Sequence, residues 1–270
     1  MSEGLRKRIL TAVVLAVALF IVLLALPPVF TVVFISAIVL LGAWEWSAFL
    51  KLPSEALRAA YAVLIGVLMF AAWSVSASAT GRTLLLGIAL AWWLVALVWV
   101  MLAPRQVAGW SAGLAGILAL VPSWLALMRL RLTLVEGAQW VLFALVLVWA
   151  ADIGAYFAGK HYGRVPLAPQ VSPGKTWEGV FGGLALSALV ALAGAAWFRL
   201  PTGPFVLLCL TAVAFSVVGD LTESLLKRYA GLKDSGTVFP GHGGVMDRID
   251  SITAAAPVLY VGLMLFGVLQ

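Results

Sequence analysis

The chain has 270 residues, of which 64% are hydrophobic and only 10% are charged. Soluble domains are about half apolar and about a quarter charged, so this composition excludes a soluble globular protein. The formal net charge of +6 sits in short loops between apolar segments, where cations set topology and suit an anionic lipid surface, so no nucleic-acid partner is expected.

Apolar segments long enough to cross a bilayer recur along the whole chain. The first follows the cations Arg6 to Arg8, is longer than the core of a signal peptide and lacks a small-residue cleavage site, so we expect a retained helix. A hydropathy window of about 19 residues predicts nine membrane helices. Their ranges are 9–26, 29–50, 59–77, 83–103, 110–128, 138–158, 179–198, 204–226 and 252–269.

The predicted fold is therefore an all-α integral membrane protein. We expect one polytopic domain over 1–270, in which 1–136 serves mainly as scaffold and 137–270 carries the site. With the N-terminus inside, 13 of the 17 Lys and Arg fall in inner segments. The positive-inside rule then predicts a cytoplasmic N-terminus, an external C-terminus and cytoplasmic positions for the longest polar loops. The four remaining cations would be external: Arg82, Arg129, Arg131 and Arg199.

Glu45 lies near the inner end of the second predicted helix. An ionisable group at membrane depth is costly and is usually paired or functional. A side chain close to a helix end can also reach the interface with its charged group. Both interpretations stay open at this point.

A polar segment follows the sixth predicted helix, which ends near Asp152. The triplet Gly-Lys-Thr that ends at Thr176 is not a P-loop, because Pro169 stands where the motif needs glycine and membrane helices flank it. Lys175, the hydroxyls of Ser172 and Thr176, and the free N–H groups at the start of the next helix favour an anion. The alternative is helix capping with a solvated lysine.

The stretch from Asp220 to Asp250 holds five of the chain's eleven carboxylates. Asp220, Glu223 and Lys227 share one helix face by their i, i+3, i+7 spacing, which predicts a polar cavity beside them. Asp247 and Asp250 repeat the i, i+3 spacing at the start of the last helix, where helix capping is an alternative role for one of them. Carboxylates on a glycine-rich loop can hold a divalent metal while cations and backbone N–H groups bind phosphate.

This stretch resembles the signature of the phosphatidate cytidylyltransferases, also called CDP-diacylglycerol synthases. The match runs in register over 27 residues, which is far more specific than a short motif. The fixed positions are Ser224, Lys227-Arg228, Lys233-Asp234, Gly236, Phe239-Pro240, His242-Gly243-Gly244, Asp247-Arg248 and Asp250. The segment 172–179 is similar to a second family motif, Ser-Pro-x-Lys-Thr-x-Glu-Gly.

The resemblance implies an enzyme of phospholipid biosynthesis that condenses CTP with phosphatidic acid to give CDP-diacylglycerol and pyrophosphate. It implies Mg²⁺ as the essential metal, a second cation for which K⁺ is the candidate, and a homodimer in a bacterial inner membrane with the site facing the cytoplasm. The candidate metal ligands are Asp220 and Asp247 first, then Glu223, Asp250 and Asp152. The candidate catalytic residues are Asp220, Asp247, Lys227, Arg248 and His242. The candidate substrate-binding residues are Ser172, Lys175, Thr176, Arg228, Lys233 and Asp234.

Two other functions use similar residues. A cation or organic-anion transporter also places carboxylates within the membrane, but it needs polar residues along a through-path. The outer halves of the last four predicted helices offer few, such as Gln139 and Tyr260. A CTP-dependent polyprenol or lipid kinase would share the metal and nucleotide chemistry, and only product analysis separates it.

The reaction that the resemblance implies needs a water-soluble nucleotide and a bilayer lipid in the same site. Moving two acyl chains into water forfeits about 0.8 kcal/mol per CH₂. We therefore expect a polar funnel that opens to the cytoplasm and a lateral gap between helices near the inner leaflet.

Overall fold

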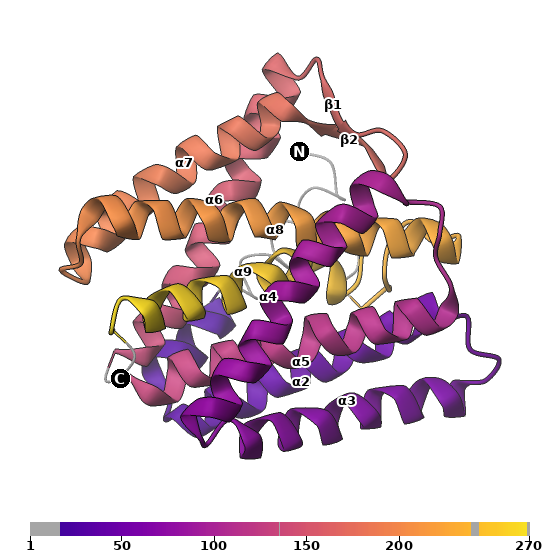
Figure 1. The fold of residues 1–270 in the computed structure, drawn as a ribbon, viewed down its shortest axis with the longest axis horizontal. Helices are drawn as coiled ribbons and strands as arrows, with labels where there is room; N and C mark the ends of the chain where they lie inside the picture. The colour runs from indigo at the N-terminus through magenta and orange to yellow at the C-terminus, as the bar shows by residue number, and fades with distance from the viewer. Residues whose placement is uncertain (1–16, 135, 239–242, 269–270) are drawn as a thin grey trace.

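The computed structural model describes residues 17–134, 136–238 and 243–268 (Figure 1). Within these ranges, eight helices are long and apolar enough to cross a membrane. They are α2 (Pro28–Trp46), α3 (Glu55–Val75), α4 (Ala79–Leu102), α5 (Gly109–Thr133), α6 (Gly137–Tyr162), α7 (Trp177–Trp197), α8 (Thr202–Ala230) and α9 (Met246–Leu265). A π-helical turn, η1 (Ile21–Ala25), precedes α2, and a 3₁₀ turn, η2 (Ser47–Leu50), continues it.

These helices confirm eight of the nine predicted spans and a multi-pass membrane protein. The first predicted span, 9–26, is described only from residue 17 onward, and this part is helical over 17–25. The backbone helices extend beyond the predicted spans where charged residues occur: α8 continues to Ala230 and α9 already begins at Met246. Hydropathy detects the apolar part of a helix, whereas backbone hydrogen bonds continue through its polar end.

A short antiparallel hairpin joins α6 to α7 and adds a β element to a fold predicted as all-α. Its strands are β1 (Pro166–Ala168) and β2 (Ser172–Thr176), with Ala168 opposite Ser172 and Pro166 opposite Thr176. The hairpin leads directly into α7, because β2 ends at Thr176 and α7 begins at Trp177. The Trp177 N–H donates a hydrogen bond to the carbonyl oxygen of Val165, at the other end of the hairpin.

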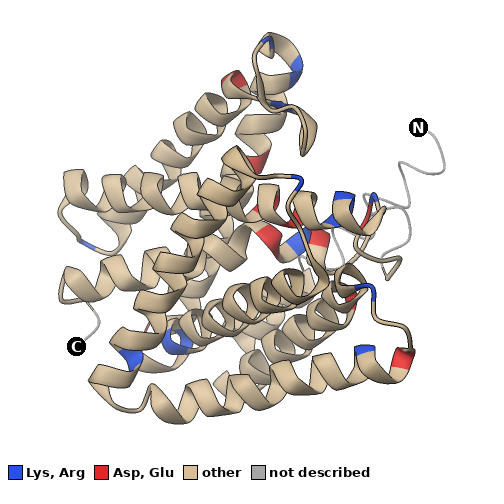
Figure 2. Cartoon of the chain, turned by 45° about the vertical axis from the view of Figure 1, so that its right-hand side comes forward, with Lys and Arg blue, Asp and Glu red and all other residues tan. Residues whose placement is uncertain are grey.

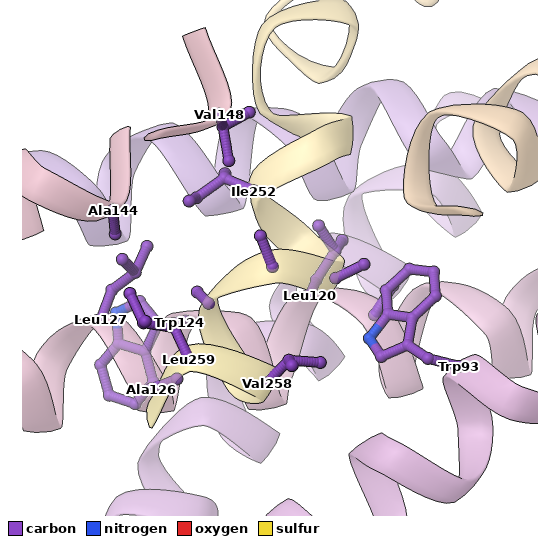
Figure 3. Close-up of a cluster of buried hydrophobic side chains, with 14 of the residues drawn as sticks. Trp93, Leu120, Trp124, Ala126, Leu127, Ala144, Val148, Ile252, Val258 and Leu259 are labelled. Atoms are coloured by element: carbon purple, nitrogen blue, oxygen red, sulfur yellow. The ribbon is translucent and has the colours of Figure 1, made fainter. Parts of the chain in front are cut away.

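The core surrounds α9, which contacts α8, α5, α6, α2 and α4. Figure 3 shows Ile252, Val258 and Leu259 of α9 among buried side chains such as Leu120 and Val148. Three consecutive alanines of α9, 254–256, are also buried, and small residues let membrane helices approach closely. The packed core therefore fixes the helix whose first turns carry Asp247 and Asp250.

The connections between the helices gather at two ends of the bundle. We call one the site end (47–54, 103–108, 163–176, 231–238 and 243–245) and the other the far end (76–78, 134, 136 and 198–201). At the site end, the Lys51 ammonium lies 4.1 Å from the centre of the Tyr229 ring. At the far end, the Arg129 guanidinium bonds to the Ser76 hydroxyl, with Nη2 and Oγ 2.7 Å apart. Most of the acidic residues in Figure 2 lie toward the end where α8 finishes and α9 begins.

Candidate metal and substrate site

Three carboxylates meet where α8 and α9 cross. The helices pass so closely at Gly219 that a Cβ atom there would lie 2.6 Å from the carbonyl oxygen of Asp250. This close approach brings Asp220 beside Asp250, and Glu223 follows one turn later on α8. One carboxylate oxygen from each of the three lies within 4.8 Å of the others. We call Asp220, Glu223 and Asp250 the acidic triad.

The acidic triad fits a divalent cation. Glu223 is 1% exposed, and its Oε1 has no hydrogen-bonding partner among the described residues. A buried carboxylate oxygen without a partner is costly, and a bound cation would supply that partner. Oxygen ligands of this kind are those that Mg²⁺ and Ca²⁺ prefer.

Two lysines lie against the carboxylates. Lys227 Nζ stands between two acids, 2.7 Å from Glu223 Oε2 and 2.6 Å from Asp247 Oδ1. Lys175, at the end of β2, forms an ion pair with Asp220. The hairpin and α8, which are remote in the sequence, therefore share one charged site.

Asp247 is held by the loop that precedes α9. Its Oδ2 accepts hydrogen bonds from the Ser235 N–H at 3.0 Å and from the Gly244 N–H at 2.8 Å. Its Oδ1 faces Lys227. Asp247 thus lies across the Lys227 ammonium from Glu223 and is not a member of the acidic triad.

These groups border a polar cavity of about 460 Å³. Its lining comes from α6, the hairpin, α7, α8 and α9. The charged residues that line it are Asp152, Lys175, Asp220, Lys227, Asp247, Arg248 and Asp250. With buried Glu223 included, five carboxylates face three cations, a formal surplus of two negative charges, which equals the charge of one divalent ion.

An apolar cavity of about 580 Å³ adjoins the polar one. Leu167, Val180 and Val217 line both cavities. The apolar cavity also takes in the end of α4, Arg105 and Trp177. A polar compartment and an apolar compartment therefore share one wall at the site end.

The predicted substrate residues divide into two groups. Lys175 and Thr176 line the polar cavity, and Thr176 also caps α7, since its Oγ1 accepts the Gly179 N–H at 3.2 Å. The expected alternative of capping is confirmed for Thr176, whereas Lys175 is paired with Asp220 and its side chain is 28% exposed. The other predicted substrate residues do not appear among the described lining of either cavity: Ser172, Arg228, Lys233 and Asp234. His242 lies outside the described residues.

Sequence reasoning missed Ser235 and left Glu45 undecided. Ser235 is 6% exposed and bonds both to Asp247 and to Glu45, yet the family signature accepts any residue at its position. Glu45 is 4% exposed, so the alternative in which it reaches the interface is wrong. In the sequence, a single carboxylate within an apolar segment indicates that Glu45 is paired or functional. No comparable feature of the sequence indicates a role for Ser235.

Comparison with known proteins gives one consistent result. Residues 6–266 match the model of the Cytidylyltransferase family. The chain is 46% identical to a phosphatidate cytidylyltransferase of Pseudomonas aeruginosa, and the alignment covers 94% of this chain and 95% of that protein. A phosphatidate cytidylyltransferase of Haemophilus influenzae is 39% identical, with 94% of this chain and 96% of that protein covered. The chain therefore belongs to the phosphatidate cytidylyltransferase family.

Proposed function

We propose that this chain condenses CTP with phosphatidic acid to give CDP-diacylglycerol and pyrophosphate. The observation that carries the proposal is the joined pair of cavities, one lined by carboxylates and cations and the other apolar. The first suits a triphosphate with its metal, and the second suits acyl chains. Membership of the family, whose named relatives are phosphatidate cytidylyltransferases, supports this choice over a transporter.

In the reaction, a phosphate oxygen of phosphatidic acid attacks the α-phosphorus of CTP. The bond from that phosphorus to the bridging oxygen of the β-phosphate breaks, and pyrophosphate leaves with the electron pair. The nucleophile is already an anion at neutral pH, so the reaction needs little general-base help. It needs charge neutralisation and in-line positioning instead.

The residues of the polar cavity suit these two tasks. The acidic triad would hold Mg²⁺, with Asp247 and Asp152 as further carboxylates of the same cavity and a second cation such as K⁺ beside them. Mg²⁺, when bound, neutralises phosphate charge and orients the reacting groups. Lys175, Lys227 and Arg248 would bind phosphate oxygens.

The remaining predicted substrate residues suit other tasks. Thr176 stands at the start of α7, where free N–H groups favour an anion. The exposed Arg228 and Lys233 suit attraction of the triphosphate toward the cavity, with Asp234 beside them in the same loop. Ser172, opposite Ala168 in the hairpin, would orient the turn that presents Lys175.

The apolar cavity supports lateral entry of the lipid. Its walls include Val100, Phe215 and Leu221, and Arg105 stands at its charged edge. We propose that acyl chains remain in this apolar compartment while the headgroup reaches the polar cavity through the shared wall. The homodimer implied by the resemblance does not affect this scheme, because one chain forms both cavities.

We further propose that the site end faces the cytoplasm and that Gln270 is external. Among the described residues, the connections of the site end hold five Lys and Arg and those of the far end hold one; with the adjoining helix turns included, the counts are ten and four. Single cysteines placed at Gly174 and at Gly203 in a Cys209→Ala background give the test. In intact cells, an impermeant thiol reagent should label position 203 and leave position 174 unlabelled; the reverse pattern would overturn the orientation.

Product analysis tests the activity itself. Purified protein with CTP, Mg²⁺ and phosphatidic acid should release one pyrophosphate for each CDP-diacylglycerol formed. The same protein with CTP and diacylglycerol or polyprenol is the control for a kinase. Formation of CDP and a phosphorylated lipid, without pyrophosphate, would replace the transferase with a kinase.

A further inference from the structure

Glu45 binds a segment that follows it by 190 residues or more. It lies in the last turn of α2 and is 4% exposed. Its Oε1 accepts the Val245 N–H at 3.0 Å, and its Oε2 accepts the Met246 N–H at 2.8 Å. The Ser235 hydroxyl lies 2.9 Å from the same Oε2. Both carboxylate oxygens are thus occupied by neutral donors, from Ser235 in the loop before α9 and from the first residues of α9.

Two of these donors belong to the start of α9. Val245 is the N-cap residue, and its own side chain makes no capping hydrogen bond. The first N–H groups of a helix have no partner within the helix, and negative charge is favoured beside them. Glu45 therefore caps α9 from a different helix, in place of a local side chain.

Ser235 connects Glu45 to the site. Its N–H donates to Asp247 Oδ2 at 3.0 Å, and its hydroxyl oxygen accepts the Asp247 N–H at 3.3 Å. A hydroxyl has one proton to donate. Asp247 Oδ2 already receives two backbone N–H groups, from Ser235 and Gly244, so the hydroxyl proton is best used by Glu45.

The loop also packs closely around the Glu45 carboxylate. A Cβ atom at either Gly236 or Gly244 would lie 2.6 Å from Glu45 Cδ. Both glycines belong to the family signature. At these two positions the close approach is to Glu45.

We propose that Glu45 is a positioning residue of the transferase site. Its carboxylate holds Ser235 and the first turn of α9 in place. The Asp247 carboxylate is thereby oriented toward the Lys227 ammonium, beside the acidic triad. The inference rests on the proposed metal site and extends it into 1–136, the part of the chain expected to be mainly scaffold.

The Glu45→Gln variant tests this role, because glutamine keeps the size of the side chain but turns an NH₂ group toward a donor. We expect Mn²⁺, used as an electron-paramagnetic probe for the divalent ion, to bind at least about tenfold more weakly, which equals about 1.4 kcal/mol. We also expect kcat to fall and hydrogen exchange of the amides at 243–247 to accelerate. The matched control is Glu55→Gln at the exposed start of α3, which should leave all three quantities unchanged.

A merely structural role predicts a different pattern. E45Q would then lower the thermal midpoint while Mn²⁺ affinity and kcat per folded molecule stay at the wild-type values, and this result would overturn the proposal. If E45Q is not recovered from membranes, Ser235→Ala replaces it, because it removes the connection and leaves both bonds from Glu45 to α9. S235A should weaken Mn²⁺ binding by at least about threefold, or about 0.7 kcal/mol, because it removes the hydroxyl that joins the Glu45 carboxylate to the Asp247 N–H.

Unchanged Mn²⁺ binding in S235A would also refute the connection. Failure of the wild-type protein to bind Mn²⁺ would remove the proposed metal site itself, which is a separate outcome. Amide exchange still tests Glu45 in that case, since unchanged exchange at the start of α9 in E45Q would contradict a positioning role.

Discussion

Charged side chains have different partners at the two ends of the helix bundle. At the far end, Arg129 bonds to Ser76 and stacks over the Trp73 ring at 4.2 Å, and Arg131 bonds to Thr31. These cations have neutral partners. At the site end, carboxylates outnumber the cations around them, and Glu223 keeps an oxygen without a partner among the described residues. A buried atom without a partner does not by itself mark a site, since Arg82 Nε near the far end also has none among the described residues. The site end differs because several carboxylates gather around one cavity.

The largest expected effect is the loss of one carboxylate at the site end. Asp220→Asn should lower kcat by more than about a hundredfold, because the metal that neutralises the transition state is held less well. Asp247→Asn should do the same, because it removes a negative charge beside the acidic triad and the charged partner of Lys227. Folded protein should still accumulate in the membrane. The measurement is CDP-diacylglycerol formation per folded molecule.

A packing role would give the reverse result, unstable protein with near-normal specific activity. If both variants keep more than about a tenth of the wild-type rate, less than about 1.4 kcal/mol of the barrier is involved. Asp220 would then not be a metal ligand, and Asp247 would not contribute to the metal site.

The matched change at the far end should affect stability alone. Arg129→Met keeps most of the apolar side chain and removes the hydrogen bonds to Ser76. The loss of a hydrogen bond to a charged group costs about 1.5–3 kcal/mol, so the thermal midpoint should fall while kcat per folded molecule stays unchanged. A large drop in kcat with an unchanged midpoint would erase the distinction between the two ends.

The smallest expected effect separates two roles of Thr176. Thr176→Ala removes the cap of α7 and should cost about 1 kcal/mol of stability, whereas Thr176→Asn keeps a capping side chain. If Thr176 only caps, T176N behaves like the wild-type protein. A KM for CTP that rises in both variants would show that the hydroxyl also binds the nucleotide.

The parts of the site that follow from local periodicity could be predicted. The i, i+3, i+7 spacing placed Asp220, Glu223 and Lys227 on one face of a helix, and hydropathy located eight of the membrane helices. The pairing of Lys175 with Asp220 and the capping of α9 by Glu45 depend on how distant segments pack. No spacing in the sequence encodes such a contact.

The hairpin and Ser235 show the same limit at shorter range. The strands Pro166–Ala168 and Ser172–Thr176 are too short for a period-two pattern to be visible. Ser235 occupies a variable position of the signature, and only its burial between Glu45 and Asp247 reveals its function in the loop.

Equilibrium binding of Mn²⁺ to the purified protein tests the central claim most directly, namely that the acidic triad holds the divalent cation. Binding should be displaced by Mg²⁺, and Asp220→Asn and Glu223→Gln should each weaken it by at least about tenfold, or about 1.4 kcal/mol. Arg129→Met at the far end should bind Mn²⁺ with the wild-type affinity. Equal affinity in the wild-type, D220N and E223Q proteins would contradict the account, because the ion would then lie elsewhere.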